Sequence, residues 1–173
     1  MASNFERYAY TKNAVLEKSS MLSTNYGRHI MNVVSDVDLE NGCVVALGDF
    51  VEDEVWKAAA PTTDKAVLII ACEPKIYEEY TKRMQEESQF YVKAGEIAEA
   101  DDMDRFDRIT LSAEAFDADA VPEVGQYVGV KAGSYKLTTL GTSEPTGVAF
   151  VGYIYNVAAN GNYRILVKRN MDV

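Results

Sequence analysis

Six carboxylates crowd residues 95–108, and they are the side chains of this sequence with the clearest capacity for chemistry. They are Glu96, Glu99, Asp101, Asp102, Asp104 and Asp107. Hard cations such as calcium require several oxygen ligands, but the segment lacks the alternating Asp or Asn ligands and the central Gly of an EF-hand loop. We therefore predict no metal site. The segment is expected to be a solvated acidic loop, or a contact with a basic partner through Asp101, Asp102 and Asp104.

Catalysis by a nucleophile and a base would have to involve His29, the one histidine of the chain. It has no second imidazole for a metal pair, and the sequence contains no Gly-x-Ser-x-Gly elbow, phosphate loop, dinucleotide fingerprint or zinc spacing. We expect a structural or surface role for His29, no catalytic residue and no cofactor. A pair of glycosidase-like carboxylates stays open, because such pairs are distant in sequence.

Two cysteines, Cys43 and Cys72, each lie in an apolar, strand-like run. A free cysteine in such a position behaves as a small buried hydrophobe. In a reducing compartment we expect free thiols in preference to a disulfide.

Composition limits the partners. The chain has 173 residues, enough for one well-buried body, and its 17 Lys plus Arg against 27 Asp plus Glu give a net charge of −10. Nucleic acid is disfavoured because phosphate binding needs a cationic footprint, so a more basic protein surface is the expected partner. No run of about 18 apolar residues and no signal-peptide pattern is present, and we expect a soluble protein made in a cytoplasm, without a membrane partner.

Residues 38–71 predict the strand unit around which the chain is built. Apolar, β-branched runs at 43–47, 55–59 and 67–71 are separated by Gly48-Asp49 and by Pro61 with a polar turn. Runs of this length bounded by Gly, Pro and Asp are typical of strands. The middle run carries the only tryptophan, Trp56.

The last third of the sequence predicts further strands. The expected strands are a short one at Ile109–Leu111, then residues 126–130, 134–138, 147–157 and 162–168. The Asn160-Gly161 pair between the last two is a strong hairpin signal. Residues 40–47 also match residues 123–130 in sequence. Each of the two segments begins a unit of three strands joined by two turns, and the middle strand of each unit carries an aromatic residue. Ancient duplication and the common pattern of small β-units both explain this match.

The remaining segments flank this β-rich body. Residues 1–35 are predicted to form an N-terminal arm in which Phe5, Tyr8, Tyr10 and Tyr26 contact a partner surface or a neighbouring subunit, because tyrosine suits interfaces. A peripheral strand and loop of the same body is the alternative for this segment. Residues 74–87 predict a short surface helix, within a helix and acidic insert at about 73–108.

The fold predicted from these elements is mainly β: a compact β-barrel or sandwich over residues 36–173 with one short surface helix and an extended N-terminal arm. The expected core consists of Val44, Leu47, Trp56, Leu68, Ile70, Val128, Phe150 and Ile154.

Several segments together resemble the head decoration, or auxiliary capsid, proteins of tailed bacteriophages. They are ENGCVVALGDF and EVWKAAAP, followed later by VGQYVGVKAGSYKL and TGVAFVGYIYNV. The later segments carry the strand, Gly turn, short strand and Gly-Val apolar strand common in that family. The resemblance extends from about residue 36 to the end, and the insert at about 73–108 departs from the smallest such proteins.

This resemblance implies a non-enzymatic structural protein of the virion. Such a protein is made in the host cytoplasm, binds the exterior of the head, and clamps neighbouring subunits of the major capsid protein beside other copies of itself. The alternative function is a small carbohydrate-binding module, using Trp56 and surface tyrosines, or a carbohydrate-active enzyme.

Overall fold

The computed structural model describes residues 12–21, 30–73, 83 and 86–173. It confirms the predicted fold class, because the chain is mainly β and contains a closed barrel. The predicted helix at residues 74–87 falls almost entirely outside the described residues. The helical elements that are described are two single 3₁₀ turns, η4 (Glu87–Gln89) and η5 (Ala113–Ala115).

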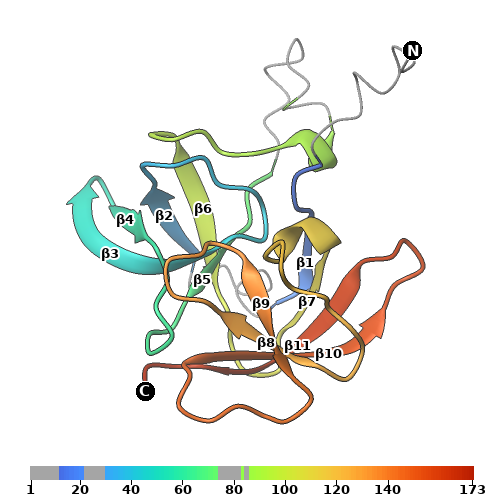
Figure 1. The fold of residues 1–173 in the computed structure, drawn as a ribbon. Coiled ribbons are helices and arrows are strands. Elements are labelled where there is room, and N and C mark those ends of the chain that lie inside the picture. The colour runs from blue at the N-terminus through green and yellow to red at the C-terminus, as the bar shows by residue number, and fades with distance from the viewer. Residues whose placement is uncertain (1–11, 22–29, 74–82, 84–85) are drawn as a thin grey trace.

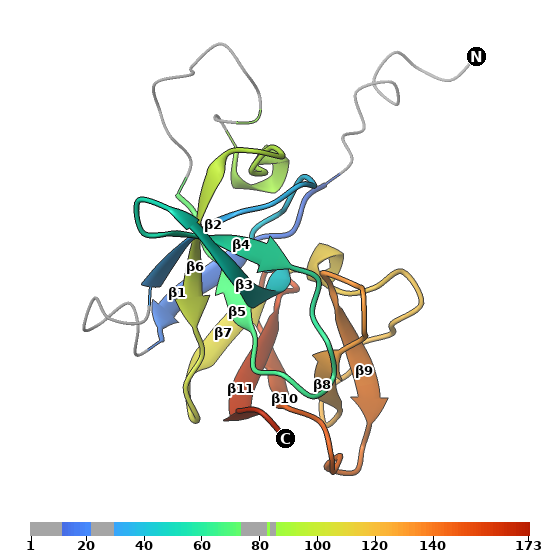
Figure 2. The same ribbon diagram turned by 90° about the vertical axis from the view of Figure 1, so that its left-hand side faces the viewer.

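Five strands close into a barrel and six form a second sheet. The barrel contains β2 (Ile30–Val34), β3 (Val44–Glu52), β4 (Val55–Ala59), β5 (Leu68–Ile70) and β6 (Ile97–Asp102). The second sheet contains β1 (Leu16–Ser20), β7 (Arg108–Leu111), β8 (Tyr127–Val130), β9 (Leu137–Gly141), β10 (Phe150–Val157) and β11 (Tyr163–Asn170). Figures 1 and 2 show the barrel and the second sheet side by side.

The two sheets share one topology. β2 to β6 pair in the order β4-β3-β5-β6-β2, and β7 to β11 pair in the corresponding order β9-β8-β10-β11-β7. The barrel closes through parallel pairing of β2 with β4, and the second sheet has the equivalent contact as an isolated parallel bridge between Phe116 and Leu137. β1 adds a further strand beside β7. The chain therefore contains two equivalent five-stranded halves, residues 30–102 and 108–170.

The equivalent central strands keep the same register. Their cross-strand pairs are Val44–Ile69 and Val45–Leu68 in the first half, and Tyr127–Tyr153 and Val128–Gly152 in the second. The turn before each central strand is also the same, since the Gly42 and Gly125 amides each donate a 2.8 Å hydrogen bond, to the carbonyls of Ile70 and Ile154 respectively. The matched sequence segments are thus a structural repeat, which the structure extends from three strands to five.

Five equivalent pairs of positions are buried in both halves. Equivalent buried pairs are Val33 and Leu111, Val45 and Val128, Ala58 and Leu137, Ile70 and Ile154, and Ala100 and Ile165. The halves also share one core, because Val44 and Ile69 point out of the barrel into the cluster that contains Leu111 and Ile154. Apolar burial of this kind is the main source of stability. The two halves consequently form one packed body.

The prediction of an arm over residues 1–35 is wrong for its described part. β1 pairs with β7 and β2 is a barrel strand, and Met21 and Val33 are fully buried. The two strands join different sheets, so their apolar residues show no common period in the sequence. The rest of that segment, with Phe5, Tyr8, Tyr10, Tyr26 and His29, lies outside the described residues.

Three members of the predicted core differ from expectation. Leu47 is 44% exposed, because it adjoins the register shift at which β3 leaves the barrel, and Trp56 and Leu68 are half-buried at the edge of the barrel core. The other predicted core residues are fully buried: Val44, Ile70, Val128, Phe150 and Ile154. Among the described residues, no helix has the length and apolar character needed to cross a bilayer.

Candidate functional site

The β3–β4 hairpin is longer in the first half than its counterpart, the β8–β9 hairpin, is in the second. Equivalent pairs, Leu47 with Ala58 and Val130 with Leu137, enclose the two hairpin ends. Residues 48–57 lie between the first pair and only residues 131–136 between the second. The longer hairpin projects from the barrel at the left edge of the molecule in Figure 1. Because the rest of the repeat is matched strand for strand, this extension is not needed to build the fold.

The tip of the hairpin has a strained backbone. Asp53 and Glu54 both have positive φ, 45° and 64°, as a type I′ turn requires. Glycine or asparagine usually fills such positions, and a side chain there costs about 1–2 kcal/mol. Two register shifts twist the hairpin, and a Cβ at Gly48 would lie 2.8 Å from the carbonyl oxygen of Lys57. Residues held in unusual backbone conformations concentrate at functional sites.

Two large apolar side chains of the hairpin are exposed to solvent. Phe50 is 57% exposed and Val51 is 49% exposed. The ring of Phe50 packs edge-on against Trp56 at 5.4 Å, which fixes its position without burying it. Exposed apolar side chains held in place in this manner are typical of contact surfaces.

The hairpin is also strongly acidic. It carries four exposed carboxylates, from Asp49, Glu52, Asp53 and Glu54. The lysine at its base, Lys57, is engaged elsewhere, because its ammonium lies 2.8 Å from Asp36 and the hydrogen bond between them raises the pKa of Lys57. The hairpin therefore presents an apolar pair surrounded by negative charge. Such a surface is suited to a partner that combines apolar and basic side chains.

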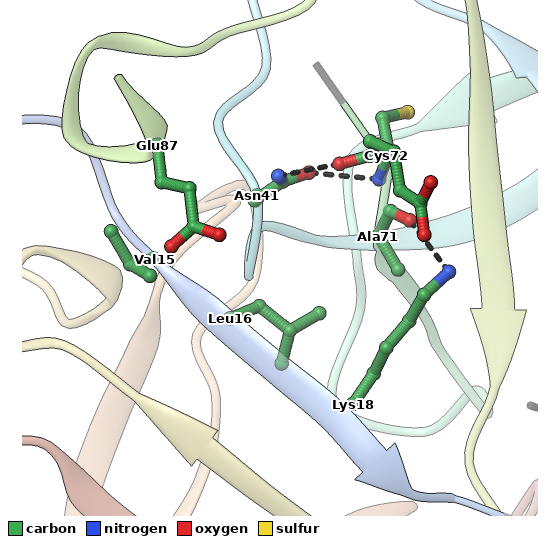
Figure 3. A pocket seen from close by; sticks show the side chains of 8 residues that line it. Val15, Leu16, Lys18, Asn41, Ala71, Cys72 and Glu87 are labelled. Carbon is green, nitrogen blue, oxygen red and sulfur yellow. Dashed lines mark hydrogen bonds between the residues drawn. The ribbon is translucent and has the colours of Figure 1, made fainter.

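A second candidate is a pocket of about 150 Å³ between β1 and the barrel, lined in part by Lys18, Asn41, Cys72 and Glu73. In Figure 3 Lys18 points from β1 toward Ala71, to whose carbonyl it donates a 2.9 Å hydrogen bond. Asn41 holds the main chain of Cys72 through two hydrogen bonds, of 2.8 and 2.9 Å.

The charged residues of this pocket hold β1 against the barrel and do not form a reactive site. The ammonium of Lys18 lies 3.1 Å from Glu99 and 3.7 Å from Asp101. Burial acts to lower the pKa of Lys18, but the hydrogen bond to Glu99 and the charges of Asp101 and Glu99 outweigh it, so the pKa is raised. A lysine kept protonated cannot serve as a base or a nucleophile at neutral pH. Lys18 instead fastens β1 to the barrel.

The surroundings of Cys43 do not suit a nucleophile. Burial raises the pKa of Cys43 to about 11, and the sulfur of Cys72 accepts a 3.0 Å hydrogen bond from the Glu99 amide. The thiolate is the reactive form, and a raised pKa removes it at neutral pH. Both thiols are free, as predicted from the sequence.

The structure separates the acidic residues predicted to act together. Residues 97–102 form β6 and not a loop, and Asp101 is fully buried beneath β1. The prediction of Asp101 as a partner contact is therefore wrong, because a side chain without exposed surface cannot meet a partner. Asp102 is half-buried and is contacted by the Asn170 amide at 3.3 Å, whereas Asp104 is exposed. A contact through Asp104 stays a prediction.

Sequence reasoning missed the acidic, apolar hairpin as a site. The signal is present in GDFVEDE, where an apolar pair interrupts a run of acids at the end of a strand. Within the described ranges, no group of three or more His, Cys, Asp or Glu is placed to hold a metal ion. Comparison with protein-family models, with curated proteins and with solved structures finds no match to this chain.

Proposed function

We propose that this chain is a structural protein of a tailed-phage virion that binds the outer surface of the capsid and stabilises contacts between major capsid subunits. The observation that carries the proposal is the projecting β3–β4 hairpin, with Phe50 and Val51 exposed among four carboxylates. The resemblance of the flanking segments to head decoration proteins supports the same function. In this function the chain performs no catalysis.

Apolar contact and charge have different parts in the proposed attachment. Burying Phe50 and Val51 in a partner removes apolar surface from water and supplies most of the affinity. Exposed ion pairs contribute only about 0–1 kcal/mol each, so the carboxylates chiefly speed the encounter and orient the hairpin on a basic face.

The test is to purify virions of the phage that encodes the chain and to identify their proteins by mass spectrometry. Capsids assembled without the chain are then incubated with purified protein, and attachment is measured by co-sedimentation. Phe50→Ser with Val51→Ser should weaken attachment at least tenfold. The matched control is Val121→Ser with Val124→Ser, because those valines are as exposed as the hairpin pair, 69% and 57%, and lie in the second half.

Absence of the chain from purified virions, together with no attachment to capsids, would overturn the proposal. Equal weakening by the hairpin pair and the control pair would overturn the assignment of the contact to the hairpin.

Carbohydrate binding is the second candidate, and the aromatic pair Phe50 and Trp56 is the observation that favours it. Sugars stack on exposed aromatic faces, and Phe50 supplies such a face beside a half-buried indole. Titration with a panel of oligosaccharides distinguishes the two functions, because a sugar on Phe50 would change the fluorescence of the neighbouring Trp56. A protein contact predicts no change with sugar and a change on adding capsids.

A further inference from the structure

The outer face of the second sheet carries a row of large side chains that crosses four strands. Cross-strand pairing places Tyr127 beside Tyr153, Tyr153 beside Leu166, and Leu166 beside Arg108. The rings of Tyr127 and Tyr153 lie 5.1 Å apart. Their chain neighbours Val128, Ile154, Ile165 and Ile109 are all fully buried. Since side chains alternate along a strand, the row lies on the side of the sheet opposite the core.

This face is basic, in contrast to the protein as a whole. Arg108 and Arg164 are exposed and Lys168 is half-buried, on the two neighbouring strands β7 and β11. Glu17 lies at the far edge on β1, where the side-chain amides of Asn160 and Asn162 contact its carboxylate at 3.4 and 3.5 Å. Tyrosine and arginine are the residues most enriched where proteins bind one another.

We infer that this face binds the β3–β4 hairpin of a neighbouring copy of the chain. The inference rests on the proposed function, and it gives the same hairpin a second partner. One hairpin binds either the capsid or a neighbouring copy, so the two contacts compete for Phe50 and Val51. Charge complementarity carries it: three basic side chains, from Arg108, Arg164 and Lys168, meet four carboxylates, and the tyrosines meet Phe50 and Val51. Opposed charges of this kind orient an encounter and disfavour other geometries.

The contact forms between copies and not within one copy. The β3–β4 hairpin projects from the barrel at the left edge of the molecule, whereas the β10–β11 hairpin of the second sheet projects at the right edge (Figure 1). A contact between two different surfaces is heterologous, so it joins copies head to tail into a ring or an open chain. Continued association beyond two copies is therefore its signature, which a two-fold symmetric dimer does not produce.

The experiment is a charge-swap cycle on the full chain, followed by sedimentation velocity across a range of concentrations. The first variant reverses the hairpin with Asp49→Lys, Glu52→Lys and Glu54→Lys. A matched control places the same three charge reversals on exposed acids outside the hairpin, Glu86→Lys, Asp119→Lys and Glu123→Lys. Circular dichroism and melting temperature establish that each variant is folded.

The second variant reverses the sheet face with Arg108→Glu, Arg164→Glu and Lys168→Glu. The wild type is expected to associate beyond a dimer at a few hundred micromolar or below, more weakly as salt is added. Each variant alone should associate at least tenfold more weakly. A mixture of the two, and a chain that carries both sets of changes, should regain association. The control triple should associate as the wild type does.

Three outcomes would overturn the inference: a wild type that stays monomeric throughout, association that stops at a dimer, or a mixture of variants that does not regain association. Capsid attachment of the same variants separates this from the proposed function. Loss of attachment in the hairpin variant, without self-association of the wild type, keeps the proposed function and rejects the copy-to-copy contact. Self-association without any attachment to capsids keeps the copy-to-copy contact and rejects the proposed function.

Discussion

Gly42 and Gly125 occupy the same position in the two halves, with φ of 86° and 92°, but their surroundings differ. A Cβ at Gly42 would lie 2.7 Å from a methyl carbon of Leu111, whereas a Cβ at Gly125 would meet nothing within 4 Å. Comparing substitutions at the two glycines therefore distinguishes the cost of a positive φ from the cost of a steric clash. It also marks where the first half packs against the second.

Alanine at the two glycines should give unequal losses of stability. Gly125→Ala should cost about 1–2 kcal/mol, since only the positive φ is unfavourable. Gly42→Ala should cost about 2–4 kcal/mol, because Leu111 must also move. Urea unfolding at pH 7 measures both values. Equal losses would mean that Leu111 shifts freely and that the contact between the halves is loose at this point.

Lys18→Met should lower the free energy of unfolding by about 1–3 kcal/mol at pH 7. The Ala71 carbonyl loses a donor, and fully buried Asp101 loses a nearby positive charge. Lys65→Met is the control, because its ion pair with Asp172 is exposed on both sides and should contribute less than about 1 kcal/mol.

The Lys18 contribution should depend on pH in the alkaline range. Its pKa is raised in the folded chain above the ordinary value of 10.5, so the stabilisation is fully present below about pH 10 and is lost as pH rises through the folded pKa. The difference between wild type and Lys18→Met should therefore be constant from pH 6 to 9 and shrink above about pH 10.5. A difference that grows with pH would contradict the assigned pairing.

Deleting residues 1–20 should lower the melting temperature of the isolated protein, contrary to the expectation for an arm. The deletion removes β1 and the fully buried Ala14, and exposes the edge of β7. A loss of about 2–4 kcal/mol corresponds to about 5–10 °C for a chain of this size. An unchanged melting temperature would show that β1 is dispensable to the fold.

Phe50→Ala and Trp56→Ala should differ in their effect on stability. Phe50 is mostly exposed, and its loss should cost less than about 1 kcal/mol. Trp56 is half-buried against the barrel core, so Trp56→Ala should cost about 1–3 kcal/mol, below the range of about 3–5 kcal/mol for a fully buried aromatic side chain. Calorimetry of both variants measures this, and a larger loss for Phe50 would mean that the hairpin is part of the core.

Salt should slow the attachment of the protein to capsids more than it promotes the release of protein that is already bound. At about 0.5 M salt the Debye length is only a few ångströms, so attachment should slow severalfold while bound protein stays bound. Light scattering after mixing gives the rate of attachment. Dilution of decorated capsids into salt gives the rate at which bound protein is released. Rapid release by salt would make charge, and not Phe50 and Val51, the main source of affinity.

Local sequence features predicted most of the strands. β3, β4, β5, β8, β10 and β11 overlap apolar runs bounded by Gly, Pro or Asn, and β7 overlaps the short predicted strand at Ile109–Leu111. The Asn160-Gly161 turn joins β10 to β11 as expected, with Gly161 at φ 86°. β9 begins three residues later than predicted, at Leu137, because residues 131–136 are used by the turn that precedes it. These features are local, and the backbone preferences that produce them act within a few residues.

The sequence by itself determined the class of the fold, three strands of each half of its repeat and its acidic balance. Only the tertiary structure decided that β1 and β2 belong to the two sheets, that Asp101 is buried while Asp53 is exposed, and that Tyr127, Tyr153, Leu166 and Arg108 form one row. The reason is physical. Strand periodicity depends on neighbours along the chain, whereas burial and a shared surface depend on which distant segments cover a side chain and which strands pair beside it.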